Sequence, residues 1–246
     1  MKKVPETDAI FERLAKVNPA ADADESVLRL SVDAKATIPL GLYSRGGYSR
    51  LTVKALDHDF APDDKITPVG VFLPQLNELY LFLTTSPVTA DLIVDCIHDT
   101  WLMIEGRFPL VRTLMLNLDN GPENHSRRTQ FVKRVVDLVD DLQLTLELAY
   151  YPPYHSKYNP IERVWGVLEQ HWNGALLDSA QTVLNFARTM TYNGVHPVVD
   201  LVTTTYQTGV KLTQKAMAKL EERLERLPGL EKYFVRISPL APQANG

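Results

Sequence analysis

The sequence predicts an α/β fold in which helices flank a mixed five-stranded sheet, formed by an antiparallel meander and then by parallel strands. Short segments in the first half of the chain follow the two-residue period of strands and are separated by turn residues. The second half alternates buried apolar runs with segments of helical period, which is the order of parallel crossover units. The composition agrees, because 45% of the 246 residues are hydrophobic and 23% are charged, as in an average globular protein.

The first half of the chain predicts a helix and then a series of strands. Residues 6–17 place apolar side chains at helical spacing and predict a short helix. From residue 27 to residue 35 apolar and polar residues alternate, which predicts a strand with Asp33 facing outward near its end. Turn residues then separate three further short strands, whose closeness in sequence favours an antiparallel meander. These strands are expected at residues 51–55, 69–73 and 79–83.

The second half predicts helices and buried strands in turn. Residues 88–105 carry an amphipathic helical pattern, and residues 114–118 form a buried apolar run that closes on the turn sequence Asp119-Asn120-Gly121-Pro122. A helix from about residue 128, a strand at 144–148, a loop rich in proline and tyrosine and a helix from Pro160 follow in that order. Two further helices are predicted at residues 179–190 and 208–227.

This order of elements matches the ribonuclease-H-like fold, a mixed sheet flanked by helices. We expect residues 26–175 to form the ribonuclease-H-like core, residues 1–25 an N-terminal helical extension and residues 176–246 a C-terminal helical extension.

Charge and cysteine content restrict the classes of function. The single cysteine, Cys96, excludes an internal disulfide and a thiolate zinc cluster. The net charge of -4 argues against a protein that coats nucleic acid by overall charge, so any such contact must be local. No apolar stretch has the roughly 20 residues of a membrane helix, and no apolar signal core follows the N-terminal Met-Lys-Lys. We therefore expect a cytoplasmic protein without a membrane partner.

Three acidic residues are candidates for chemistry, and each has an ordinary explanation when taken alone. Asp119 follows a buried strand, where ligand sites tend to form, but it also begins a turn sequence. Glu162 follows Asn159-Pro160, so it can belong to a capping box at the start of a helix. Asp33 can be a solvated residue on a strand, although aspartate is disfavoured there. None of the three is specific by itself.

Taken together, the three acids fall at one end of a ribonuclease-H-like sheet. Three carboxylates brought together would repel one another and raise one another's pKa, so such a site needs bound cations. Hard carboxylate oxygens without paired cysteines or histidines favour Mg²⁺ or Mn²⁺ over zinc. Two such ions, about 3.5 to 4 Å apart, can activate an attacking oxygen and stabilise a leaving oxygen in an in-line phosphoryl displacement.

Three short segments resemble the catalytic blocks of bacterial insertion-sequence transposases of the Asp-Asp-Glu (DDE) type, in the retroviral-integrase superfamily. These segments are Ser31-Val32-Asp33, Leu118-Asp119-Asn120-Gly121-Pro122-Glu123-Asn124 and His155-Ser156-Lys157-Tyr158-Asn159-Pro160-Ile161-Glu162. The resemblance implies that Asp33, Asp119 and Glu162 are catalytic and bind the two metal ions. It also implies phosphodiester hydrolysis and strand transfer at insertion-sequence ends, with transposon ends and target DNA as partners. Such an enzyme would join the nucleoid when bound to DNA and could act as a homo-oligomer there.

Further residues surround these blocks. Four polar residues are candidates for orienting the acids or touching the phosphate, namely Asn120, Asn124, His155 and Asn159. Asn159 can equally be a helix cap. Three basic residues can contact DNA phosphates or be ordinary surface charges, namely Lys35, Lys157 and Arg163. Trp165 is interpreted as a core residue of the helix that follows Glu162.

Two alternatives to a transposase stay open from the sequence. The chain can be an inactive or domesticated nucleic-acid-binding relic of the same fold, or a structure-directed nuclease such as a ribonuclease H. A tyrosine recombinase is disfavoured, because its catalytic domain is helical and this pattern contains a sheet. Only about 25 residues precede the first predicted strand, so we expect a catalytic domain without the N-terminal helix-turn-helix region that such transposases usually carry.

Overall fold

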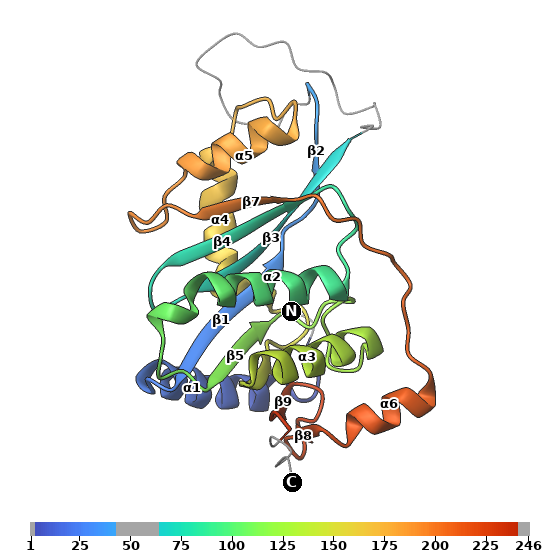
Figure 1. Cartoon of the computed structure of the whole chain (residues 1–246). Helices are drawn as coiled ribbons and strands as arrows, with labels where there is room; N and C mark the ends of the chain where they lie inside the picture. Colours follow the sequence, from blue (N-terminus) through green and yellow to red (C-terminus); the bar gives the residue numbers. More distant parts are fainter. Residues whose placement is uncertain (1–2, 43–63, 241–246) are drawn as a thin grey trace.

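One mixed sheet runs through the computed structural model, which describes residues 3–42 and 64–240 (Figure 1). The strands in this described part are β1 (Val27–Ala34), β2 (Ile38–Pro39), β3 (Lys65–Leu73), β4 (Glu78–Thr84), β5 (Thr113–Leu118), β6 (Thr145–Tyr150), β7 (Val198–Val202), β8 (Leu224–Arg226) and β9 (Phe234–Ile237). Their order in the sheet is β7-β4-β3-β1-β5-β6-β9-β8, and β2 pairs with β3 outside this path.

The predicted fold class is confirmed at the centre of the sheet. Strands β1, β3 and β4 pair antiparallel, and β1, β5 and β6 pair parallel, as a meander followed by crossover units requires. The sheet is wider than the five strands predicted, because β7 adds to β4 at one edge while β9 and β8 add to β6 at the other. The strand predicted at residues 51–55 lies outside the described residues.

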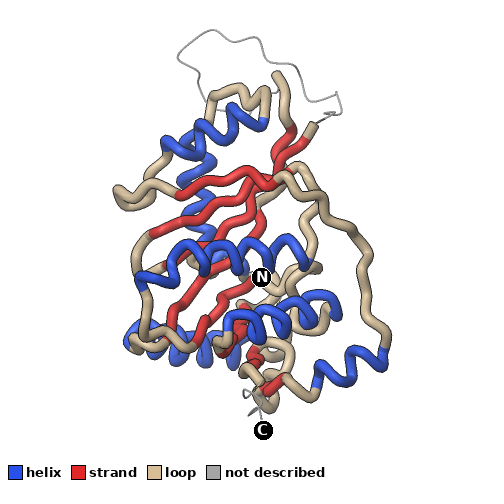
Figure 2. The backbone as a smooth tube through the Cα atoms, in the orientation of Figure 1, coloured by secondary structure: helices blue, strands red, loops and turns tan. Residues whose placement is uncertain are grey.

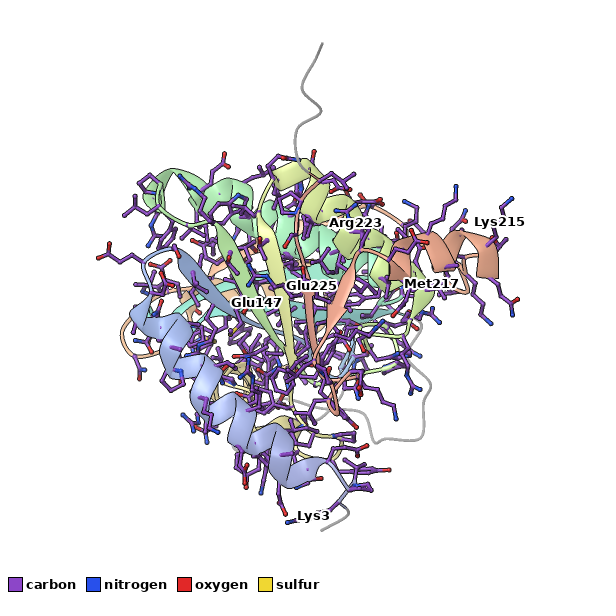
Figure 3. All side chains as sticks on the ribbon, turned by 90° about the horizontal axis from the view of Figure 1, so that it is seen from below. Lys3, Glu147, Lys215, Met217, Arg223 and Glu225 are labelled. Atoms are coloured by element: carbon purple, nitrogen blue, oxygen red, sulfur yellow. The ribbon has the colours of Figure 1, made fainter. Side chains whose placement is uncertain are left out.

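Helices cover both faces of the sheet (Figure 2). They are α1 (Thr7–Ala23), α2 (Ala90–Ile104), α3 (Thr129–Leu142), α4 (Ile161–His171), α5 (Ala180–Thr189) and α6 (Gln214–Glu221). Helices α2 and α3 lie together on one face, and α1 lies on the opposite face (Figure 3). Helix α4 packs on β1 and β3 behind the sheet in Figure 1. No helix in the described ranges is long and apolar enough to cross a membrane.

Strand β1 is buried on both faces from Leu28 to Val32, and Asp33 near its end is partly exposed. Arg29 and Ser31 are 8% and 0% exposed, because α1 and α4 pack against β1. Each buried polar side chain has partners: Arg29 pairs with Asp22 of α1 and donates to Asn117 of β5. Burial of these groups is tolerated because their hydrogen bonds are made within the protein.

Two helix predictions are wrong in extent. Helix α1 continues to Ala23 with Pro19 inside it, whereas the apolar pattern predicted an end at residue 17. The helix predicted at residues 208–227 is limited to α6, because the chain then turns into β8 and pairs Leu224 with Ile237 of β9. Pairing of β9 with the edge of β6 therefore takes precedence over the helical spacing of the leucines.

Helix α4 approaches β3 closely at Gly70, which is the partner of Asp33 in the β1–β3 register. A Cβ atom at Gly70 would stand 2.6 Å from Cη2 of Trp165 and 2.7 Å from Cδ1 of Ile161. These distances are shorter than real Cβ contacts, so only glycine lets α4 lie this near the sheet.

We predict that Gly70→Ala lowers the free energy of unfolding by about 1–3 kcal/mol, the usual cost of overpacking a core. Gly166→Ala is the matched control, because Gly166 lies in α4 and a Cβ there would meet no atom within 4 Å. The control should gain about 0.5–1 kcal/mol from replacing a helical glycine. Urea unfolding followed by circular dichroism measures both, and equal effects would contradict the close packing described above.

Candidate active site

Asp33 and Asp119 lie at neighbouring strand ends. Strands β1 and β5 are parallel and adjacent, and their register pairs Ser31 with Asn117, two residues before each acid. The carboxyl ends of parallel strands meet at one edge of a sheet, where ligand sites form. Both aspartates line a cavity of about 420 Å³ at this edge.

Burial and the charges of the other two acids raise the pKa of the Asp33 carboxyl group. Burial is the largest cause of its raised pKa, which stands at about 7, and the neighbouring Asp119 and, more weakly, Glu162 raise it further. A hydrogen bond from Trp165 works in the opposite direction and lowers this pKa. The structure thus brings the three acids predicted from the sequence into one local electrostatic field.

Both aspartates are held in fixed orientations. Trp165 donates its Nε1 hydrogen to Oδ2 of Asp33 at 2.8 Å. Oδ1 of Asp119 accepts from the backbone N–H of Gly121 at 3.1 Å and from Nδ2 of Asn124 at 2.9 Å. Both of these bonds end on the same oxygen, so Oδ2 of Asp119 accepts no hydrogen bond from the described residues. Orientation by neighbouring donors is typical of carboxylates that bind metal ions.

Glu162 is placed by a buried link between β1 and the start of α4. Ser31 Oγ donates to Oδ1 of Asn159 at 2.6 Å and accepts from the backbone N–H of Ile161 at 3.0 Å. Nδ2 of Asn159 donates to the carbonyl oxygen of Val32 at 3.3 Å. The capping explanation of Asn159 is therefore wrong: Pro160 occupies the N-cap position, and the Asn159 side chain bonds to β1 instead of to the helix.

The remaining polar candidates differ in their distance from the acids. Asn124 contacts Asp119 directly, as described above, while Asn120 occupies the turn after Asp119 with a φ of 63°. His155 is 3% exposed and contacts Phe11 and Tyr158 rather than an acid, with its Nδ1 at 2.9 Å from the carbonyl oxygen of Pro153. Its position supports the loop before α4.

The three basic candidates lie at separate places around the site. Lys35 lines the cavity and forms an ion pair with Glu169 at 2.9 Å. Lys157 places its Nζ 5.2 Å from the ring centre of Tyr158, and Arg163 is exposed on α4 next to Glu162. Lys35 thus lines the same cavity as the two aspartates, whereas Lys157 and Arg163 flank Glu162 in the sequence.

Sequence reasoning missed two residues that orient Asp33 or the loop after Asp119. Trp165 belongs to the core as expected, but its indole N–H also holds Asp33. Tyr150 is fully buried and donates its hydroxyl to the carbonyl oxygen of Asn124 at 2.6 Å. The signal that could have found them is chemical, because a buried indole N–H or tyrosine hydroxyl usually needs a partner.

The loop after Asp119 is also held by the C-terminal strands. Arg226 of β8 donates to the carbonyl oxygen of Ser126 at 2.9 Å, and Ser126 Oγ donates to the carbonyl oxygen of Lys232 at 2.7 Å. Strands β8 and β9 lie beside β6 in Figure 3, where Glu147 marks β6 and Glu225 marks β8. We call residues 224–237 the C-terminal hairpin.

The donor set suits a hard divalent cation. Asp119 can only accept hydrogen bonds, so the amide nitrogen of Asn124 must face it, and the buried Oδ1 of Asn124 is left without a partner. A Cβ atom at Gly121 would stand 3.2–3.3 Å from this oxygen and from both carboxylate oxygens of Asp119, so glycine keeps this place open. In residues 3–42 and 64–240, no three acidic, histidine or cysteine side chains stand at metal-binding distances from one another.

A family model described as the Rhodopirellula transposase DDE domain matches residues 1–239. The chain belongs to this family. No curated protein matches it. The sequence resemblance to DDE transposases is thereby confirmed at the level of the family.

Solved structures with a similar fold come from the Mos1 transposase. They are the Mos1 transposase paired-end complex with left transposon end, with a TM-score of 0.50, and the Mos1 mariner paired end complex with Mn, with a TM-score of 0.52. Each is 14% identical in sequence, and the match covers 74% of this chain and 52% of the Mos1 chain. The chain therefore spans about half the length of these proteins, and the likeness shows a shared ribonuclease-H-like fold.

We predict that Asn159→Ala lowers the free energy of unfolding by about 1–3 kcal/mol, because it leaves buried polar groups of β1 without partners. Asn173→Ala is the control, since Asn173 is exposed just beyond α4. Chemical unfolding measures both variants. The buried link would have no such role if the two variants were equally stable.

A second prediction concerns the pH dependence of stability in the metal-free protein. The pKa of Asp33 is raised in the fold, so the folded state binds more protons than the unfolded state between about pH 4 and pH 7 and loses stability as pH rises through this range. Asp33→Asn removes this loss. In EDTA the variant should be more stable than wild type at pH 8, by up to about 4 kcal/mol at 1.4 kcal/mol per pKa unit, and equal to it near pH 4.

Asp140→Asn is the control of opposite sign. The hydrogen-bonded Arg223 lowers the pKa of Asp140, so this pair stabilises the fold at neutral pH and loses its effect in acid. Thermal unfolding across the pH range distinguishes the two substitutions. Equal stability of Asp33→Asn and wild type at pH 8 would contradict the burial of a charged Asp33.

Proposed function

We propose that this domain catalyses metal-dependent phosphodiester hydrolysis and strand transfer at insertion-sequence ends, with Asp33, Asp119 and Glu162 as ligands of two Mg²⁺ or Mn²⁺ ions. The observation that supports the proposal is that Asp33 and Asp119 follow neighbouring parallel strands and line one cavity, and that burial and the charges of both Asp119 and Glu162 raise the pKa of Asp33. Membership in a transposase DDE family supports the same chemistry.

The residues of the chain would orient these ligands and the DNA. Trp165 and Asn124 hold the aspartates, and Asn159 holds the helix that carries Glu162. When bound, the divalent ions would supply Lewis-acid stabilisation of the attacking and leaving oxygens. Lys35, at the cavity, would contact a phosphate of the bound strand. The substrates are transposon ends and target DNA, and we propose that the protein assembles as a homo-oligomer on them.

We propose that residues 26–175 are the catalytic core, since the three acids lie within this range. The described parts of the flanking segments, residues 3–25 and 176–240, pack against this core. Helix α1 contacts the loop before α4 through Phe11, and the C-terminal hairpin holds the loop after Asp119. The flanking segments would therefore influence the geometry of the acids without binding the ions.

Asp119→Asn tests the proposal. We expect wild type to bind Mn²⁺ in calorimetric titration and to nick supercoiled plasmid DNA with Mn²⁺, and the variant to lose activity about a hundredfold or more. Asp137→Asn, which changes an acid on α3 paired with Lys133, is the control and should bind and cleave like wild type. Equal Mn²⁺ binding by Asp119→Asn and wild type would sink the ligand assignment.

Joining of a pre-cut 3′-hydroxyl end to a second DNA tests the strand-transfer step separately. We expect joined products from wild type with Mn²⁺ and none from Glu162→Gln. Preferential cleavage of an RNA–DNA hybrid over duplex DNA would contradict the proposed substrate and indicate a ribonuclease H activity instead.

A further inference from the structure

The loop from β6 to α4 joins the surroundings of two candidate acids. At its start, the backbone N–H of Tyr151 donates to the carbonyl oxygen of Leu118 at 2.8 Å, immediately before Asp119. At its end, Glu162 lies in the first turn of α4. The two ends of this loop therefore lie next to Asp119 and Glu162.

Two tyrosine side chains of this loop are exposed. Tyr154 is 67% exposed and Tyr158 is 48% exposed, whereas Tyr150 and Tyr151, at the end of β6, are 0% and 6% exposed. An exposed aromatic ring contributes little hydrophobic stabilisation to the fold, because little of its surface is removed from water. Rings that are gathered beside a functional site are typical of surfaces that bind a partner.

Tyr154 occupies a strained backbone conformation. Its φ is 67°, in the left-handed region where a residue with a bulky side chain is rare. The conformation is fixed locally, because the backbone N–H of His155 donates to the carbonyl oxygen of Pro152 at 3.0 Å. Glycine would occupy this position without strain. The ring at this position is therefore mostly exposed on a strained backbone.

Tyr158 presents a ring that is fixed by its neighbours. Phe11 of α1 packs edge-on against it with ring centres 5.1 Å apart, and the His155 ring lies 6.2 Å away at an interplanar angle of 24°. The 3-10 helix Ser156–Tyr158 and the buried Asn159 fix the backbone on its other side. A ring held in this way loses little conformational entropy when a ligand stacks on it.

Positive charge lies beside the Tyr158 ring and beside Glu162. Lys157 lies over the Tyr158 ring, and Arg163 follows Glu162. Within the described residues neither cation forms an ion pair with an acidic side chain. Aromatic rings next to unpaired cations match a nucleic-acid strand whose bases are accessible, since rings stack on base faces and cations attract phosphates. The bases of an intact duplex hide these faces.

We propose that Tyr154 and Tyr158 form a stacking surface for unpaired nucleotides of the DNA strand at the candidate active site, with Lys157 and Arg163 contacting its phosphates. The inference rests on the proposed function, which identifies the bound strand as DNA. Beyond that function, it states that the DNA is bound with bases unstacked or unpaired next to the reacting phosphate.

Fluorescence anisotropy with a labelled oligothymidine of about 12 nucleotides, in EDTA to prevent cleavage, tests this surface. Tyr154→Ala should weaken binding about five- to a hundredfold, because base stacking on an aromatic ring contributes on that scale. Tyr154→Phe keeps the ring and should bind within about twofold of wild type. Lys157→Gln should reduce the slope of log affinity against log salt by about one.

Tyr154→Gly separates binding from structure. Relief of the left-handed strain should raise the melting temperature, while loss of the ring weakens binding, so the two readouts move in opposite directions. Leu110→Ala is the control, since Leu110 is 58% exposed before β5, at the opposite end of that strand from Asp119, and should bind like wild type. Wild-type affinity in Tyr154→Gly, or equal weakening by Phe and Ala, would overturn the inference.

The outcome is distinguishable from failure of the proposed function. If plasmid nicking depends on Asp119 but oligothymidine binding is indifferent to Tyr154, the stacking surface is wrong and the chemistry stands. If oligothymidine binding depends on Tyr154 but wild type neither nicks nor joins DNA, the surface stands and the chemistry is wrong.

Discussion

The buried hydrogen bonds of Asn159 are the constraint on which the site depends. One hydroxyl group, that of Ser31, donates to the Asn159 side chain and accepts from the first N–H of α4, so the central strand and the helix cannot move independently. Gly70 lets the helix approach the sheet, and the indole of Trp165 then reaches Asp33. A fully satisfied polar link of this kind gives a unique geometry, whereas an apolar contact would allow sliding.

That geometry brings the negative charges of Asp119 and Glu162 close to the largely buried carboxyl group of Asp33. Burial and the neighbouring acids raise the pKa of Asp33, so the metal-free site lowers the stability of the fold at neutral pH. Residues elsewhere must offset this. The large apolar clusters on the two faces of the sheet do so, and the hydrogen bonds of Asn159 and Asn124 restrain the backbone next to the acids.

The sequence was sufficient for the features that depend on local period and short motifs. Strands β3 to β6 and helices α2 to α4 follow from their apolar patterns, and the blocks around Asp33, Asp119 and Glu162 follow from resemblance. It was insufficient where partners lie far apart in the chain. Asn159 satisfies the local rule for a cap, yet its side chain bonds to Val32 and Ser31, which precede it by 127 and 128 positions. Leu224 satisfies a helical spacing, yet its strand exists only because β9 pairs with the edge of β6.

The C-terminal hairpin determines when the contacts around the candidate site can form during synthesis of the chain. Arg226 follows Ser126 by 100 residues, so the loop after Asp119 leaves the ribosome long before the strands that anchor it. The backbone N–H of Tyr150 likewise donates to the carbonyl oxygen of Tyr233, so this bond can form only after residue 233 has been synthesised. A growing chain thus carries all three acids before their surroundings are complete. The loop after Asp119 gains its contacts with Arg226 and Lys232 only when the hairpin has been synthesised and added to the sheet.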